Sequence, residues 1–187
     1  MKIGILAVQG AFAEHAAMLD KLGAESFEIR GLRDLENSMD GLILPGGEST
    51  VMNKLLHEIG LFNPLYEKMK NGLPVFGTCA GMILLAKNVN GGSSCFGIMD
   101  ISVKRNAYGR QLGSFYTHSS FDCNENVPMT FIRAPYIESV GNGVDVLSIV
   151  DGKIVAARQA NMLVTSFHPE LDDDFTVHKY FLKMIEK

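Results

Sequence analysis

Apolar and polar residues follow two different patterns along the first half of the chain. Short apolar runs bounded by turn residues predict buried strands, and the stretches between them carry apolar residues three or four positions apart, which predicts helices. The expected strands are residues 2–8, 26–30, 41–44 and 74–76. The expected helices are residues 11–22, 49–60 (capped by Ser49), 64–70 and 82–87. Alternation of strand and helix favours a parallel sheet with helices on both faces.

The pattern changes after about residue 95, where short, turn-bounded segments with strand character follow one another. These segments are residues 98–104, 112–117, 129–133, 144–150, 153–158 and 162–167. Asp151-Gly152 between two of them is a strong hairpin signal. The aspartates at 172–174 then place negative charge at the start of a last helix that runs to Ile185. We find no repeat or linker and expect one domain spanning residues 1–187.

The composition narrows the class of protein. The 187 residues include 17 basic and 21 acidic side chains, and the net charge of −4 gives no bulk attraction to nucleic acid or anionic lipid. No apolar run approaches the roughly 18 residues that span a bilayer, and the N-terminal run is expected to be a strand rather than a signal peptide. Three cysteines are too few for a disulfide framework or a zinc cluster. We therefore expect a soluble, reduced, cytoplasmic α/β protein with no metal site and no nucleic-acid or membrane partner.

The segment Gly77-Thr78-Cys79-Ala80-Gly81 lies between an expected strand and an expected helix. A nucleophile flanked by small residues at such a junction is typical of a nucleophile elbow, in which glycines permit a strained turn. The start of the following helix favours a thiolate, and the Ala80 N–H is placed to donate to an oxyanion. An isolated segment of this kind fits a buried structural cysteine in a tight turn equally well.

A thiol nucleophile needs a base, and His168 is the strongest candidate among five histidines. It follows the apolar run 162–167, and strand ends are where catalytic groups lie in open parallel sheets. Glu170, two residues further on across Pro169, can hold the imidazole in one tautomer. The other histidines are expected to be solvated or partly packed on helices, or to lie in a loop. They are His15 (on the polar side of the first helix), His57, His178 and, in the loop, His118.

The segment Pro45-Gly46-Gly47-Glu48-Ser49 joins an expected strand to an expected helix. Two glycines at a strand end expose backbone N–H groups that can bind an anion or an oxyanion. Alone this signal is weak, because such turns are common connections. The segment is not a P-loop, since the Gly-Lys-Ser/Thr ending is missing.

In combination, three segments resemble the catalytic triad regions of class I glutamine amidotransferases, in that family's chain order. These segments are residues 45–49, 77–81 and 168–170. Others resemble one branch of the family, the glutaminase subunits of pyridoxal 5'-phosphate synthase: Gln9-Gly10 with Glu14-His15, and residues 105–111, 131–135 and 166–171. The resemblance covers essentially the whole chain. It implies a three-layer, flavodoxin-like α/β fold with a mostly parallel central sheet and additional antiparallel strands in the C-terminal half.

The resemblance also implies roles for individual residues. Cys79 attacks the side-chain amide of L-glutamine, His168 shuttles protons and Glu170 orients His168, so that ammonia leaves and water hydrolyses a γ-glutamyl thioester. The N–H groups of Gly47 and Ala80 are implied to stabilise the oxyanion. The residues implied to bind glutamine are Gly47, Glu48, Ser49, Arg105, Ile132 and Arg133. No cofactor is implied for this chain, and the ammonia passes to a separate synthase subunit in a hetero-oligomeric complex that makes pyridoxal 5'-phosphate.

Three alternatives stay open at this point. The chain could be the glutaminase subunit of another amidotransferase such as imidazole glycerol phosphate synthase, although such subunits usually carry Cys-Leu-Gly where this chain has Cys79-Ala80-Gly81. It could be a cysteine hydrolase of the related flavodoxin-like families, which generally lack His-Pro-Glu near the C-terminus. The third alternative is a non-catalytic binding module. The intact Cys79, His168 and Glu170 argue against it, because such a module would be free to lose any of them. For the leading hypothesis, the flexible Gly46-Gly47 peptide predicts low activity of the free subunit.

Overall fold

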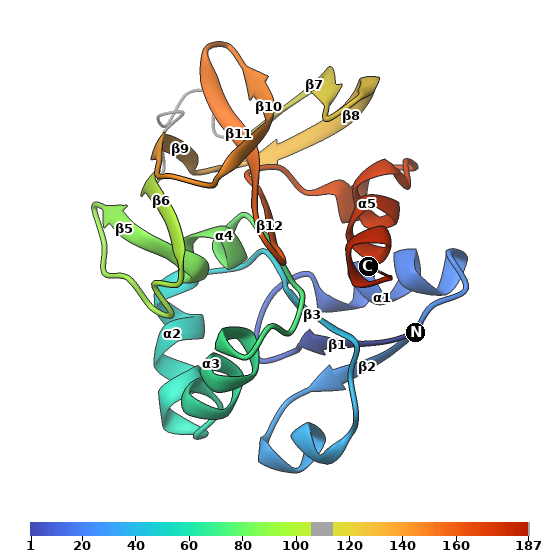
Figure 1. Ribbon diagram of the computed structural model, residues 1–187, viewed down its shortest axis with the longest axis vertical. Coiled ribbons are helices and arrows are strands. Elements are labelled where there is room, and N and C mark those ends of the chain that lie inside the picture. The colour runs from blue at the N-terminus through green and yellow to red at the C-terminus, as the bar shows by residue number, and fades with distance from the viewer. Residues whose placement is uncertain (106–113, 187) are drawn as a thin grey trace.

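The central sheet of the computed structural model, which describes residues 1–105 and 114–186, has a parallel half and an antiparallel half (Figure 1). The strands of the parallel half are β1 (Lys2–Leu6), β2 (Glu25–Ile29), β3 (Gly41–Leu44), β4 (Val75–Thr78) and β12 (Met162–Thr165). They lie in the order β2-β1-β3-β4-β12, and every neighbouring pair is parallel. This half matches the alternation of strands and helices in the sequence.

The antiparallel half continues the same sheet beyond β12. Its strands are β11 (Lys153–Gln159), β9 (Tyr136–Val140), β6 (Met99–Lys104), β5 (Ala86–Asn90) and β10 (Asp145–Val150). β11, β9 and β6 alternate in direction, the edge strand β5 runs parallel to β6, and β10 pairs with β11. A separate hairpin is formed by β7 (Ser114–Phe121) and β8 (Asn124–Ile132). These strands supply the antiparallel part that the resemblance implies.

Helices cover both faces of the sheet (Figure 1). They are α1 (Phe12–Lys21), α2 (Ser49–Glu58), α3 (Phe62–Lys70), α4 (Ala80–Leu85) and α5 (Thr176–Ile185), with 3₁₀ turns η1 (Leu32–Glu36) and η2 (Pro169–Leu171). Successive strand residues point to opposite faces, so Leu42 and Leu44 of β3 join the core under α2, α3 and α4, whereas Ile43 joins the core under α1 and α5. No helix in the described parts of the chain is long and apolar enough to cross a membrane.

The structure confirms the expected fold class and corrects several details. β3 has the expected bounds, but the expected helix 82–87 is wrong at both ends, because α4 spans Ala80–Leu85 and Ala86 begins β5. The sequence does not predict β5 or β9. β5 lies at the edge of the sheet with mostly exposed polar side chains, so it shows no apolar run. His118 lies on β7 rather than in a loop, and residues 112 and 113 of the expected strand 112–117 lie outside the described residues.

Candidate active site

Four neighbouring parallel strands end at one edge of the sheet, and the segments after them carry the candidate catalytic groups. β1 leads to Gln9, β3 leads to the turn 45–49, β4 leads to Cys79, and β12 leads to His168. The carboxyl ends of parallel strands meet at the same edge, so residues far apart in the sequence converge there. The topology thus brings the expected nucleophile, base and oxyanion turn together.

Cys79 lies in a strained turn between β4 and α4. Its φ of 47° and ψ of −97° are unfavourable for an L-residue, at a cost of order 1–3 kcal/mol. The Cys79 N–H donates to the Thr165 carbonyl of β12 at 2.8 Å, which ties the elbow to the strand that leads to His168. A Cβ atom at Gly81 would lie 1.9 Å from the Leu44 carbonyl oxygen. The cysteine is therefore the strained residue, and glycine at position 81 serves close packing.

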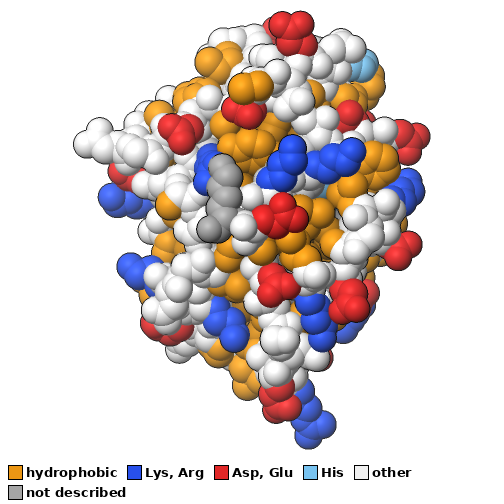
Figure 2. Space-filling view, turned by 45° about the vertical axis from the view of Figure 1, so that its right-hand side comes forward, with side chains coloured by type: hydrophobic (Ala, Val, Ile, Leu, Met, Phe, Trp, Pro, Cys, Tyr) orange, Lys and Arg blue, Asp and Glu red, His pale blue; other side chains and the backbone are white. Residues whose placement is uncertain are grey.

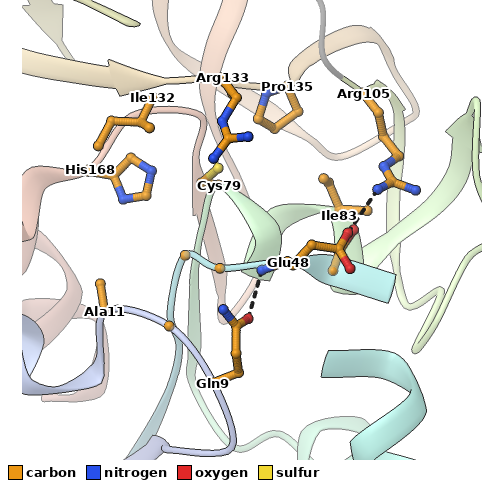
Figure 3. A pocket seen from close by; sticks show the side chains of 14 residues that line it. Gln9, Ala11, Glu48, Cys79, Ile83, Arg105, Ile132, Arg133, Pro135 and His168 are labelled. Atoms are coloured by element: carbon orange, nitrogen blue, oxygen red, sulfur yellow. Dashed lines mark hydrogen bonds and ion pairs between the residues drawn. The ribbon is translucent and has the colours of Figure 1, made fainter. Parts of the chain in front are cut away.

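Cys79 is 7% exposed, and its side chain lines a cavity of about 500 Å³ (Figure 3). His168 lines the same cavity, as do all the residues implied to bind glutamine: Gly47, Glu48, Ser49, Arg105, Ile132 and Arg133. Ala80 and Glu170 do not line it. Ala80 is the first residue of α4, so its N–H has no acceptor within the helix and is free for an oxyanion.

His168 and Glu170 form the buried part of the expected triad. His168 Nδ1 lies 2.7 Å from Glu170 Oε1, which leaves Nε2 for Cys79. Burial would lower the pKa of His168, but hydrogen bonds to Cys79 and Glu170 and their negative charges raise it to about 10. Burial would raise the pKa of Glu170, but imidazoles near both of its oxygens lower it. His168 is therefore an imidazolium at neutral pH, which can give a proton to a leaving amine.

Gly46 and Gly47 fix the floor of the cavity in different ways. The His168 ring packs directly on Gly46, where a Cβ atom would lie 2.3 Å from His168 Cε1. The Gly46 carbonyl accepts a hydrogen bond from the Ala11 N–H at 3.0 Å, which sets the orientation of the Gly46–Gly47 peptide. A Cβ atom at Gly47 would lie 2.5 Å from Gln9 Oε1, the atom that accepts from the Glu48 N–H at 2.7 Å. Neither position has room for a larger residue without a shift.

Glu48, rather than Ser49, caps α2, so the expected cap is wrong by one residue. The Glu48 carboxylate accepts hydrogen bonds from the N–H groups of Thr50 and Val51 and from the Thr50 hydroxyl, and it pairs with Arg105 at 3.2 Å. The Thr50 hydroxyl is the largest cause of the lowered pKa of Glu48, and Arg105 adds to it. Ser49 begins the helix, and its buried Oγ has no hydrogen-bond partner within the described residues. Opposite charges therefore face the cavity, and a buried, unpaired hydroxyl lies at its wall.

Ile132 and Arg133 reach the cavity from the end of β8 (Figure 3). Arg133 has a φ of 44°, a left-handed conformation that is uncommon for residues other than glycine, and its guanidinium group points toward the cavity. The Thr130 carbonyl of the same strand accepts a hydrogen bond from the His168 N–H at 2.8 Å. The hairpin is thus attached to the loop that carries the candidate base.

Gln9, Ile83 and Pro135 also line the cavity, and no role for them is predicted from the sequence. Gln9 lies within a segment that carries the resemblance, but its hydrogen bond to the Glu48 N–H could not be inferred from its spacing. Residues 106–111 of the segment that begins at Arg105 lie outside the described residues.

The expectation that His15 and His178 are solvated or partly packed is wrong. Both are fully buried, and His15 lies on the apolar side of α1 rather than on its polar side. A signal was available in the sequence. His15 follows Phe12 by three positions and precedes Leu19 by four, which places it on the same helix face as those residues.

The three cysteines differ in environment. Cys79 lines the cavity, Cys95 is half-buried and Cys123 is exposed, and all three are free thiols. Burial raises the pKa of Cys95 to about 12, so this thiol is unreactive at neutral pH.

On the face of the described chain shown in Figure 2, acidic and basic side chains are interspersed among apolar ones.

The fold and the cavity define a class of protein, and the comparison with family models identifies it. Residues 5–187 match the SNO glutamine amidotransferase family, and the chain belongs to that family. A solved structure described as a glutamine amidotransferase superimposes with a TM-score of 0.92 at 39% identity, over 99% of each chain.

Two curated proteins that match this chain over almost its whole length share one name. The pyridoxal 5'-phosphate synthase subunit PdxT of Methanocorpusculum labreanum is 61% identical over 99% of this chain and 98% of its own length. The protein of the same name from Streptococcus pneumoniae serotype 2 is 58% identical over 100% of this chain and 99% of its own length. These findings confirm the family resemblance drawn from the sequence motifs.

Proposed function

We propose that this chain is the glutaminase subunit of a pyridoxal 5'-phosphate synthase, and that it hydrolyses L-glutamine with Cys79, His168 and Glu170 as its catalytic triad. The main support is geometric. Cys79 and His168 line one cavity at the sheet edge, and Glu170 holds His168 from behind at 2.7 Å. Membership of the amidotransferase family and the high identity to PdxT proteins support the same substrate.

The proposed reaction has two halves. Cys79 Sγ attacks the side-chain carbonyl carbon of glutamine, and the carbonyl oxygen becomes an oxyanion that the Gly47 and Ala80 N–H groups stabilise. The C–N bond breaks, His168 gives its proton to the nitrogen, and ammonia leaves a γ-glutamyl thioester on Cys79. Water then attacks the thioester while His168 takes a proton from it, the C–S bond breaks, and glutamate leaves as the free Cys79 sulfur and the protonated His168 are restored. No cofactor enters either half.

The charges at one end of the cavity suit an amino acid. Glutamine carries an ammonium and a carboxylate group, and Glu48 and Arg105 offer one charge of each sign 3.2 Å apart. Arg133 adds a second cation. Ile132 supplies an apolar wall for the methylene groups of the substrate.

Ammonia released here is proposed to pass to a separate synthase subunit in a hetero-oligomeric complex. We expect the free subunit to be slow, because a Gly-Gly peptide is flexible enough to switch its orientation, and the Ala11 N–H holds the Gly46 carbonyl in the present one. We further propose that residues 1–187 form one domain and that the protein is cytoplasmic, where free thiols such as the exposed Cys123 persist.

The deciding experiment measures glutamate formed from glutamine with and without the synthase subunit. The proposal predicts turnover that rises when the synthase is added. Turnover of peptides or aldehydes with no action on glutamine would instead indicate a cysteine hydrolase. A glutamine-analogue electrophile should label Cys79 in a Cys123→Ser background, which removes the exposed competing thiol. Labelling that glutamine does not slow would contradict the proposed binding site.

A further inference from the structure

Two more histidines lie buried behind the candidate triad, one on α1 and one on α5. These two helices lie side by side in Figure 1. His15 on α1 and His178 on α5 are both 0% exposed. His15 Nδ1 lies 3.0 Å from His178 Nε2, and His15 Nε2 lies 3.2 Å from Thr78 Oγ1 and 3.5 Å from Glu170 Oε2. The Glu170 carboxylate therefore has an imidazole beside each oxygen, His168 at Oε1 and His15 at Oε2.

The hydrogen positions of the pair follow from the available acceptors. A proton on His178 Nδ1 would be a buried donor without a partner, because that atom makes no hydrogen bond within the described residues. The proton is therefore on His178 Nε2 and is donated to His15 Nδ1. A neutral His15 then carries its own proton on Nε2, which faces Thr78 Oγ1 and Glu170 Oε2.

Both imidazoles are neutral at pH 7. Burial lowers the pKa of His15 and outweighs the nearby carboxylates of Glu170 and Glu14, and the charge of His168 lowers it further. Burial also lowers the pKa of His178, to about 3, with a further contribution from His15 that outweighs Glu170. His15 thus offers Glu170 the positive end of an N–H dipole rather than a full charge.

We propose that His15 is a positioning residue of the triad, whose Nε2–H dipole stabilises the charge on the second oxygen of Glu170 from 3.5 Å away while His178 fixes the tautomer of His15. Glu170 Oε2 is buried and makes no hydrogen bond within the described residues, and a charged oxygen in that position is costly unless a donor faces it. The inference rests on the proposed triad. His15 touches neither the substrate nor the cavity, so it acts through Glu170.

Packing alone does not account for these two side chains. Both rings meet Phe76 edge to face, with centroids 5.9 Å and 5.7 Å away, and phenyl rings could make the same contacts. What a phenyl ring could not supply is the chain of nitrogens from His178 through His15 toward Glu170.

Two amide substitutions separate the two contacts of His15. The amide of His15→Gln reaches about as far as Nε2 and can still donate toward Glu170, whereas the shorter amide of His15→Asn reaches only the Nδ1 position, beside His178. In the complex with the synthase subunit, we expect His15→Gln to keep most of the glutaminase kcat. We expect His15→Asn to lower kcat by about ten-fold or more with little change in KM.

The pH profile gives a readout that loss of packing alone would not move. Without the His15 donor, the pKa of the buried Glu170 rises, so the acid limb of kcat in His15→Asn should move to higher pH while that of His15→Gln stays near wild type. His57→Gln, on the exposed side of α2, is the matched control. Equal rates and equal acid limbs for the Gln and Asn variants would overturn the inference.

A measurement on the unmodified protein covers the case in which the variants do not fold. Nitrogen-15 NMR of the imidazoles at pH 7 should show His15 and His178 as neutral Nε2–H tautomers. A His15 proton on Nδ1 would overturn the inference. Cys79→Ala separates this test from the proposed function: full glutaminase activity in Cys79→Ala would refute the triad itself, whereas an inactive Cys79→Ala with an unaffected His15→Asn would refute only the role of His15.

Discussion

The Glu170 carboxylate lies between two regions of the molecule that both contain histidine. The histidine is charged in one region and neutral in the other. On the open side, His168 lies between Glu170 and Cys79 at the cavity, and its pKa is raised to about 10. On the closed side, His15 and His178 lie in the core and their pKa values are lowered. Burial acts against the charged form on both sides, and only His168 has two anionic partners that outweigh it. Burial keeps His15 and His178 neutral, whereas the anionic partners of His168 reverse its effect there.

The largest effect is expected at the open side from Cys79→Ala. Removing the thiol removes the covalent route, so glutaminase activity of the complex should fall by about three orders of magnitude or more. The melting temperature should change little, because alanine keeps the Cβ atom and the backbone hydrogen bond to Thr165. Cys123→Ala removes an exposed thiol outside the cavity and should keep full activity. Activity in Cys79→Ala would remove the nucleophile from the proposed mechanism.

A smaller effect is expected from displacing the imidazole on the open side. Gly46→Ala places a Cβ atom 2.3 Å from His168 Cε1, so the ring must shift away from its position beside Cys79. A misplacement of about 1 Å can cost about 100-fold in rate, and we expect a loss of kcat of that order. Gly31→Ala is the control, since a Cβ atom there meets nothing within 4 Å. Equal rates in the two variants would show that the cavity floor does not hold His168 in place.

Arg105→Met should affect binding more than chemistry. The guanidinium group lines the cavity and pairs with Glu48 at 3.2 Å, so its loss should raise KM by roughly 10-fold to 100-fold and leave kcat within a few-fold. Lys104→Met removes the neighbouring cation, which pairs with Glu138 outside the cavity, and should leave KM unchanged. A fall in kcat without a rise in KM would place Arg105 in the chemical step instead.

The last effect is expected at the closed side, in the pH dependence of stability rather than in activity. The pKa of His178 is lowered from 6.5 to about 3 in the folded protein, so the unfolded chain binds an extra proton between those values. The contribution of His178 to the free energy of unfolding is therefore constant above pH 6.5. It falls as the pH drops toward 3, by up to about 1.4 kcal/mol per pH unit. Urea titrations should show a shallower slope for His178→Phe. A slope equal to wild type would mean that His178 does not contribute as a buried neutral group.

The two regions also differ in how far the sequence predicts them. Cys79 and the His168–Glu170 pair lie in short local motifs at strand ends, so their residues could be singled out directly. Arg105, Ile132 and Arg133 come from separate segments, and only the family resemblance joined them to the site. The contact between His15 and His178 spans 163 positions and joins two helices, and no local pattern records which helices meet. For the same reason the polar edge strand β5 escaped prediction, since its existence depends on β6.

The hydrogen bond between the Cys79 N–H and the Thr165 carbonyl has a consequence for how the protein could diversify. It belongs to the pairing of β4 with β12, in which Thr78 lies opposite Thr165, and backbone pairing holds such strands about 4.8 Å apart whatever their side chains. The spacing of the two main-chain segments that carry the nucleophile and the base is thus set by backbone pairing. Surface loops and outer helix faces can change to suit a new partner while the spacing of the reacting groups stays the same.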